Sequence, residues 1–220
     1  MFPTRKTPLA WKNLTHDWRR LLVAVAGVGF AVLLMFTQVG FQNALFDSQV
    51  KMIDDIEGDI FLASRAKYTL AAEKRFPREL INQARSCPGV AGVYPLYTEL
   101  TFSRLRNLKS GGSRKAYPIR SIGFHLEDPI FLARQVTDQL NSLRTPWAAL
   151  IDLRSKPENF DFPLDDPVAL SKAPAELAGK HIHLVGTFDL GTDFAHDGNL
   201  IMSAENFALF FPERQQGSTR

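Results

Sequence analysis

The sequence predicts an α+β protein: one N-terminal transmembrane helix, followed by a domain that contains part of a ferredoxin-like βαβ layer. The helix is predicted by residues 21–41, a charge-free and mostly apolar run. A helix of that length rises about 30 Å, the thickness of the hydrocarbon core of a bilayer. The domain is predicted by the remaining sequence, where strand-like alternation and helix-like periodicity follow one another. A composition of 45% hydrophobic and 22% charged residues excludes a disordered or low-complexity chain.

The charges on either side of the apolar run predict its orientation. Five Lys and Arg residues precede the run, whereas residues 42–60 contain one Lys beside five acidic residues. Since Lys and Arg accumulate on the cytoplasmic side, we expect a cytoplasmic segment over 1–20, a transmembrane helix over 21–45 and a periplasmic domain over 46–212 in a bacterial inner membrane. A cleaved signal peptide is the alternative, but its apolar region covers only about 7–15 residues. No later stretch of the sequence predicts a second span.

An amphipathic segment precedes the transmembrane helix. Four apolar residues recur at helical spacing and share one face: Trp11, Leu14, Trp18 and Leu21. Trp with basic neighbours is typical of the lipid headgroup layer. We therefore expect Trp11, Trp18, Arg19 and Arg20 at the membrane interface, on a helix that lies flat there. The alternative is that these residues only fix the topology.

The first half of the domain is expected to follow the order strand, helix, strand, strand, which gives the βαβ layer. Its elements are a helical stalk over 42–57, a strand over 59–64, a helix over 76–86, a strand over 90–105, a turn over 107–115 and a strand over 116–125. Gly58 ends the stalk, and Pro77 suits the first turn of the next helix, which Cys87-Pro88-Gly89 ends. The long strand is rich in β-branched and aromatic residues and is kinked near Pro95.

The second half of the domain surrounds an excursion that is rich in Pro and acidic residues. Its elements are a helix over 127–143, a strand over 147–153, the excursion over 154–180, strands over 181–188 and 199–203, a helix over 204–211 and a polar tail over 213–220. Pro129 lies near the start of the first helix, and Pro212 ends the last one.

The sequence offers candidates for chemistry, none of which we interpret as a catalytic, cofactor or metal site. His181 and His183 share one face of a strand, but a zinc site needs three or four converging ligands, so a half-exposed strand face is the favoured interpretation. The acidic run 54–59 lacks the glycine-punctuated pattern of a calcium loop and is interpreted as solvated surface. Cys87 is the single cysteine, and we expect it to be a small buried apolar group. We expect no enzyme activity, no cofactor bound by this chain and no nucleic-acid partner.

The segment Ser110-Gly111-Gly112 is similar to the signature stretch of ABC ATPases. The sequence nevertheless contains no Gly-x4-Gly-Lys-Ser/Thr phosphate-binding loop. We therefore interpret this segment as a hairpin turn.

The N-terminal order of motifs resembles a known family. Residues 8–14 (PLAWKNL), 19–27 (RRLLVAVAG), 30–36 (FAVLLMF) and 40–47 (GFQNALFD) resemble the DevC permease subunit of DevBCA-type ABC exporters, within the MacB/FtsX-like permease superfamily. A second match at 186–194 (GTFDLGTDF) and 197–201 (DGNLI) is similar to a segment of their extracytoplasmic domain. The two matches lie at opposite ends of the chain.

The resemblance implies the N-terminal part of a permease subunit with a MacB-like periplasmic domain. Its partners would be the membrane, a cytoplasmic ABC ATPase that hydrolyses ATP, a periplasmic membrane fusion protein and, indirectly, a TolC-like outer-membrane channel, and it is compatible with a homodimer. The cargo would be an envelope glycolipid or a similar substrate. Family members have three more membrane helices after this domain, so we expect these 220 residues to be a truncated product, a split half or a piece of a longer chain. The alternatives are a stand-alone single-pass periplasmic adaptor or sensor and a membrane-anchored periplasmic enzyme.

Two polar loops are expected to meet the partner: the hairpin tip Ser110–Lys115, with Ser110 and Arg114, and the excursion 154–180. Within the excursion, Phe160 and Phe162 flank Asp161 at a strand-like spacing, which places both rings on one face. Exposed rings would form an apolar anchor for the partner. Buried rings would instead fix the excursion to the domain.

Overall fold

A computed structural model of the chain describes residues 16–54, 56–62, 77, 79–109, 115–131, 133–191 and 196–212. The chain divides into two units, Met1–Phe46 and Asp47–Arg220.

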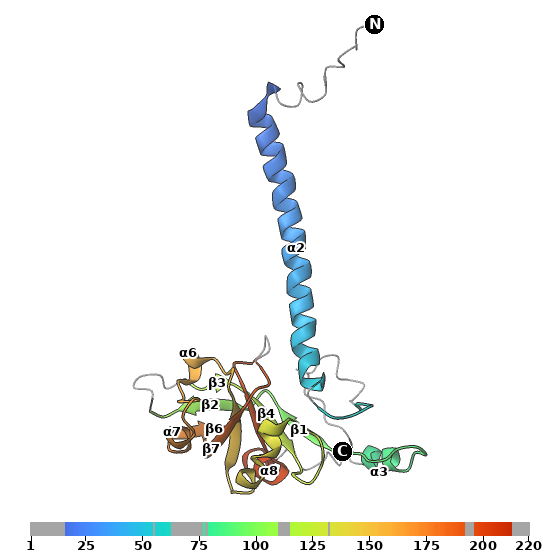
Figure 1. The fold of residues 1–220 in the computed structure, drawn as a ribbon, viewed down its shortest axis with the longest axis vertical. Helices are drawn as coiled ribbons and strands as arrows, with labels where there is room; N and C mark the ends of the chain where they lie inside the picture. The colour runs from blue at the N-terminus through green and yellow to red at the C-terminus, as the bar shows by residue number, and fades with distance from the viewer. Residues whose placement is uncertain are drawn as a thin grey trace. The chain divides into compact units, whose positions relative to one another are not determined.

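The first unit contains most of helix α2 (Trp18–Asp54), in which the expected transmembrane segment and the expected stalk form one continuous helix of 37 residues (Figure 1). Its sequence contains no Pro, the residue that most often breaks a helix. The helix ends at Asp54, four residues before Gly58, so the prediction that Gly58 ends it is wrong. The chain turns here because Ile56 enters the core of the second unit.

A mixed β-sheet forms the centre of the second unit. In the described part of the chain, eight strands lie in the order β1-β4-β8-β5-β7-β6-β2-β3. Their bounds are β1 Leu96–Glu99, β2 Arg104–Asn107, β3 Tyr117–Pro118, β4 Arg120–Phe124, β5 Ala148–Asp152, β6 Ala175–Leu177, β7 Lys180–Phe188 and β8 Asn199–Ser203. β4 and β8 are parallel, as are β5 and β7, and the other pairs are antiparallel.

The central strands are buried on both faces of the sheet because alternate side chains enter two different cores. Ala149 and Ile151 belong to the first core and Leu150 to the second. Helices α6 (Pro157–Phe160), α7 (Pro167–Ser171) and α8 (Ala204–Phe210) contribute to the first core. Helices α4 (Arg134–Thr137) and α5 (Leu140–Leu143) contribute to the second. Figure 1 shows β7, β6 and β2 side by side, with α7 next to them.

Helix α8 packs very closely on β4. A Cβ atom on Gly123 would lie 2.6 Å from Cβ of Phe207, nearer than real Cβ contacts allow. Ser203 caps the helix, since its hydroxyl accepts a hydrogen bond from the backbone N–H of Asn206 at 3.1 Å. A glycine on the strand and a serine at the helix start therefore fix this contact.

The α+β class is confirmed, and the elements of its second half lie close to their predicted positions. Strands β5, β7 and β8 and helix α8 match the predictions at 147–153, 181–188, 199–203 and 204–211. Two short helices, α4 and α5, replace the single helix predicted over 127–143. The excursion 154–180 is a crossover that contains α6, α7 and β6 and joins the parallel strands β5 and β7.

The first half differs more from its prediction. Residues 59–62 form no strand, and Ile60 is 81% exposed, so the expected βαβ order does not begin there. Helix α3 (Glu79–Arg85) lies within the predicted 76–86. The long strand predicted over 90–105 is two strands, because the buried Glu99 carboxylate accepts the backbone N–H groups of Thr101 at 3.1 Å and Phe102 at 2.9 Å and ends β1 in a turn.

The split strand makes the sheet curl. Residues 100–103 connect β1 to β2, although these strands lie near opposite ends of the sheet order. Ser103 closes the gap: its hydroxyl is 2.7 Å from that of Ser121 on β4, and its carbonyl accepts the backbone N–H of Ile119 at 3.1 Å. These contacts hold the β1–β4 end of the sheet to the β2–β3 end, although the two ends are far apart in the strand order.

Candidate functional site

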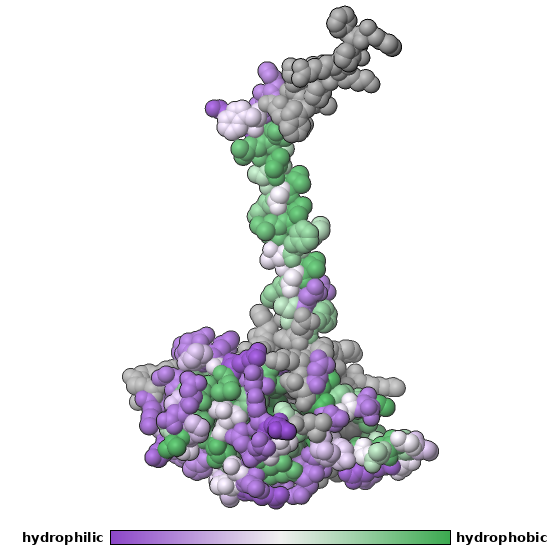
Figure 2. Space-filling model, in the orientation of Figure 1, coloured by the Kyte–Doolittle hydropathy of each residue, from purple (hydrophilic) through white to green (hydrophobic). Residues whose placement is uncertain are grey.

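The residues of helix α2 from Trp18 to Ala44 are long and apolar enough to cross a membrane. Within the described residues, no other helix meets this criterion. Large apolar side chains are exposed along it, among them Val23 (71%) and Phe36 (72%), and Figure 2 shows them covering the visible face of the helix. Exposure of an apolar surface of this length to water is unfavourable, so the surface needs a cover of lipid or of another apolar surface.

The expected interface residues lie at the start of this helix. Trp18 is exposed, and the Arg19 guanidinium carbon is 5.9 Å from the centre of its ring. Arg20 forms an exposed ion pair with Asp17, with 3.0 Å between Nε and Oδ2. Trp11 lies outside the described residues. The basic and aromatic character of this helix end suits a headgroup layer, and its placement at the membrane remains a prediction.

The end of helix α2 joins the second core through a short junction. Ile56 is 9% exposed and packs in the cluster that contains Ile130 and Phe131. The backbone N–H of Glu57 donates a hydrogen bond to the carbonyl of Ile130 at 2.8 Å. In the same loop as Ile130, burial raises the pKa of Asp128 against the opposing effect of nearby cationic groups. The junction thus joins the helix end to the loop before α4 without a glycine-rich linker.

A buried polar network lies at the carboxyl end of β5. The Asp152 carboxylate is fully buried and accepts hydrogen bonds from Arg154 N at 3.0 Å, Gly191 N at 2.8 Å and Asn199 Nδ2 at 2.5 Å. Asn199 also donates to the Gly191 carbonyl at 2.7 Å and accepts from Arg120 Nε at 2.8 Å. These bonds hold the β7–β8 connection against the end of β5, and they satisfy the buried side chains that make them.

A second, more exposed layer holds the same connection. The Arg154 guanidinium lies 2.7 Å from the Asp189 carboxylate, and this hydrogen bond and charge raise the pKa of Arg154. Asp197 accepts Lys156 Nζ at 2.7 Å and Asn159 Nδ2 at 2.8 Å. The printed bonds pair the described cations and anions of both layers with one another, so the two layers position the described ends of the β7–β8 connection.

The sequence did not reveal this network. Asp189, Gly191, Asp197 and Asn199 all fall in the second family-like match, whose polar residues interrupt apolar strands. Their partners, which run from Arg120 to Asn159, precede them by 35 to 79 positions, and only the fold brings them together. The signal available in the sequence was Asp152, a carboxylate that ends the otherwise apolar strand β5.

The base of the predicted hairpin lies next to the excursion. Asn107, at the end of β2 and the base of the 107–115 turn, donates to the carbonyls of Phe160 at 2.9 Å and Asp161 at 2.8 Å in the excursion. The backbone N–H of Leu108 donates to the Pro174 carbonyl at 2.9 Å. Ser110 and Arg114 lie outside the described residues. The base of the hairpin and the excursion therefore form one continuous surface.

Phe160 and Phe162 are not exposed anchors. They are 2% and 9% exposed, and their rings stack with centroids 6.5 Å apart and an angle of 14° between planes. Both belong to the first core. The strand-like spacing was misleading: Phe160 ends the short helix α6, and Asp161 has a left-handed φ of 47° that reverses the chain. The rings are therefore buried and fix the excursion to the domain, which was the alternative to an exposed anchor.

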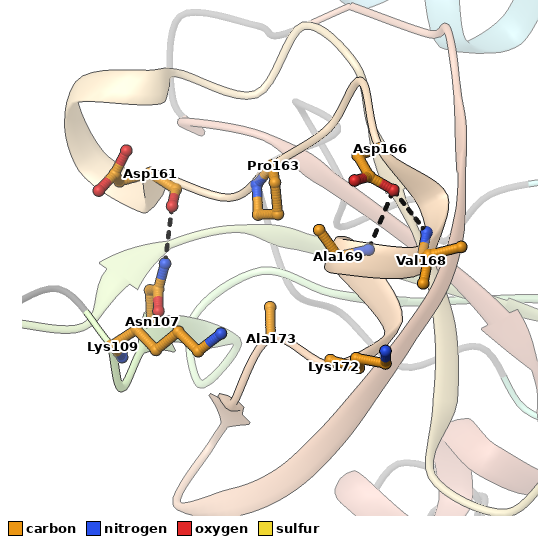
Figure 3. A pocket seen from close by; sticks show the side chains of 9 residues that line it. All are labelled: Asn107, Lys109, Asp161, Pro163, Asp166, Val168, Ala169, Lys172 and Ala173. Atoms are coloured by element: carbon orange, nitrogen blue, oxygen red, sulfur yellow. Dashed lines mark hydrogen bonds between the residues drawn. The ribbon is translucent and has the colours of Figure 1, made fainter.

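A cavity of about 500 Å³ opens on this surface. It lies between the end of β2, the loop after α6 and helix α7 (Figure 3). Its lining consists of Asn107, Lys109, Asp161, Pro163, Asp166, Val168, Ala169, Lys172 and Ala173. It has room for part of another molecule.

The remaining candidates do not converge into a site. His181 and His183 are exposed on alternate positions of β7, as the strand-face interpretation predicted, whereas His196 is buried. Within the described ranges, no group of three His, Cys, Asp or Glu residues could hold a metal ion. Cys87 is exposed, so the prediction that it is buried is wrong. It follows helix α3, which has no buried residue against which it could pack.

Comparisons with known proteins show a structural likeness. No family model and no curated protein matches this chain. Among solved structures, it is similar to the extracellular domain of the noncanonic ABC-type transporter YknZ from Gram-positive bacteria. The match covers 70% of this chain and 75% of that domain, with 14% sequence identity and a TM-score of 0.39.

Proposed function

We propose that this chain is the N-terminal part of the permease subunit of an ATP-driven export system, with one helix in the inner membrane and its α+β domain in the periplasm. The continuity of helix α2 carries the proposal, because a single helix runs from the apolar span to Asp54 and the buried Ile56 follows two residues later. A helix without a flexible joint can pass a displacement from one end to the other. The family resemblance of residues 8–47 and 186–201 supports the same function.

The finer roles follow from that resemblance. A separate cytoplasmic ATPase hydrolyses ATP, and the helix carries the movement to the domain. The domain contacts a membrane fusion protein that leads to a TolC-like outer-membrane channel, and the cargo is an envelope glycolipid or a similar substrate. Trp11, Trp18, Arg19 and Arg20 hold the helix end at the cytoplasmic face, and two copies of the chain form the permease.

A seven-residue Gly/Ser insertion between Ser48 and Gln49 tests the role of the helix. We expect ATP hydrolysis by the complex purified from its bacterium to lose its stimulation by the fusion protein, because a flexible joint absorbs the displacement. The measurement compares the stimulated rate with that of the unmodified complex. The chain carries an affinity tag, and copurification of the ATPase and the fusion protein with it is measured first, to show that the complex forms.

A helical insertion of equal length is the matched control. Seven Ala, Glu and Lys residues add nearly two turns and change the helix phase by only about 20°, so stimulation should largely persist. Equal rates for the two insertions would show that the helix is only an anchor. A chain that purifies with a periplasmic partner and without an ATPase would instead support the stand-alone adaptor or sensor.

A second prediction concerns topology. Because the Lys and Arg residues precede the span, alkaline phosphatase fused after Arg220 should be active and β-galactosidase at the same position inactive. An N-terminal tag should remain on the chain in the membrane fraction, since the span is longer than a cleaved signal peptide requires. The opposite pair of reporter activities would reverse the orientation, and loss of the tag would mean that the helix is removed.

A further inference from the structure

The cavity beside helix α7 has a preformed wall. Asn107 forms part of one side, where its Nδ2 donates to two carbonyls of the excursion and its Oδ1 accepts the Lys109 backbone N–H at 2.9 Å. On the opposite side, Asp166 Oδ1 accepts the backbone N–H groups of Val168 at 2.9 Å and Ala169 at 3.1 Å. Hydrogen bonds therefore fix both sides before anything enters, which lowers the entropic cost of binding.

Two lysines and two aspartates line the cavity, and their charged groups are oriented differently. Figure 3 shows Lys109 and Lys172 on the same side of it, with the carboxylate of Asp161 turned away. The Asp166 carboxylate caps α7. Both lysines are exposed, and no ion pair to either side chain is found among the described residues. Two ammonium groups thus remain available on one rim.

The rest of the lining is small and apolar. Pro163, Ala169 and Ala173 form part of the wall, and Val168 is 62% exposed at its edge. A ligand that fits this lining needs aliphatic side chains beside its carboxylates. Because both cations lie on an open rim and no charged side chain is buried in the cavity, the geometry suits an extended segment better than an enclosed small molecule.

We propose that this cavity binds an acidic, aliphatic peptide segment of a periplasmic protein. The carboxylates of the segment pair with Lys109 and Lys172, and its aliphatic side chains contact Val168 and Ala169. The inference rests on the proposed function, because the membrane fusion protein is the partner expected to supply the segment. The contact depends on salt, since both cations are exposed.

A binding measurement on the purified full chain in detergent tests the chemistry directly. The probe is a labelled eight-residue peptide that alternates Glu and Val, and the reference peptide replaces each Glu by Gln. We expect only the Glu peptide to bind, and the double variant Lys109→Glu/Lys172→Glu to weaken it about tenfold or more, because two exposed pairs become repulsions. The variant Ala169→Phe fills the cavity without a change in charge and should also weaken binding.

The controls separate this site from general electrostatics and from lipids. Arg134→Glu/Arg144→Glu makes the same change in net charge at α4 and after α5, which serve the other core, and should leave binding unchanged. Equal binding of the Gln peptide, or undiminished binding by the lysine variant, would overturn the proposal. If dihexanoyl phosphatidylglycerol displaces the labelled peptide at a lower concentration than the unlabelled Glu peptide does, the cavity binds a lipid headgroup. That result would also overturn the proposal.

Copurification from the native bacterium separates this proposal from the proposed function. If the lysine variant loses the fusion protein and retains the ATPase, the cavity is the docking site. If the variant retains both proteins, the cavity proposal fails and the permease function stands. If the unmodified chain retains neither protein, the permease function fails, and so does the assignment of the segment to the fusion protein.

Discussion

The double variant Phe160→Ser/Phe162→Ser should lower the melting temperature of the domain by roughly 10 °C or more. Each ring is buried and the two stack on each other, so the change removes a paired aromatic contact and leaves a cavity in the first core. A buried Phe-to-small substitution costs about 3–5 kcal/mol. For a domain of this size, each kcal/mol corresponds to about 2–4 °C. The two costs add incompletely because the rings touch.

Two variants of the same excursion are controls for this prediction. Phe160→Leu/Phe162→Leu keeps most of the apolar volume and should lose much less stability. Val168→Ser changes an apolar side chain that is 62% exposed, and it should shift the melting temperature by no more than about 2 °C. Thermal unfolding of the three variants by circular dichroism makes the comparison. A double Ser variant as stable as Val168→Ser would show that the rings do not belong to the core.

Asp152→Ala should destabilise the domain by about 3–5 kcal/mol. The substitution leaves the Gly191 N–H and one hydrogen of the buried Asn199 amide without their acceptor, and each lost partner costs about 1–3 kcal/mol. It also removes the charge at the centre of a network that includes the buried Arg120 guanidinium. The measurement is the free energy of unfolding from urea titration.

Asp189→Ala is the matched control, because it removes a carboxylate from the same loop. Its ion pair with Arg154 is partly solvated, with side-chain exposures of 59% for Arg154 and 35% for Asp189, so the cost should stay below about 1 kcal/mol. Equal losses for Asp152→Ala and Asp189→Ala would show that the buried network contributes no more than a surface pair. Recovery by Asp152→Asn should be partial, since an amide accepts fewer hydrogen bonds than a carboxylate.

The sequence predicted the parts of the fold that depend on local periodicity. β5, β7 and β8 were recognisable because apolar residues alternate or run together between turn residues, and α8 because Pro212 follows a helical pattern. These elements form the centre of the sheet and one side of its first core. Burial on both faces made their signal strong.

The parts that were missed depend on side-chain contacts. The break between β1 and β2 comes from the Glu99 carboxylate, which competes with the strand for the next backbone N–H groups, and periodicity does not reveal such a contact. The run at 59–64 has a strand-like composition, yet none of the described strands pairs with the exposed residues Ile60, Phe61 and Leu62. The network around Asp152 and the cavity between β2 and α7 combine residues that are distant in sequence, so they required the fold.

The position of β8 has a consequence for how the domain is made. β8 follows the other seven described strands in sequence, yet it lies between β4 and β5 in the middle of the sheet. Until residues 199–203 have been synthesised, β4 and β5 lack the strand that pairs with both of them. Long-range pairing of this kind slows folding and leaves apolar strands open to association with other chains. The growing domain therefore depends most on protection by chaperones in the interval just before β8 is synthesised.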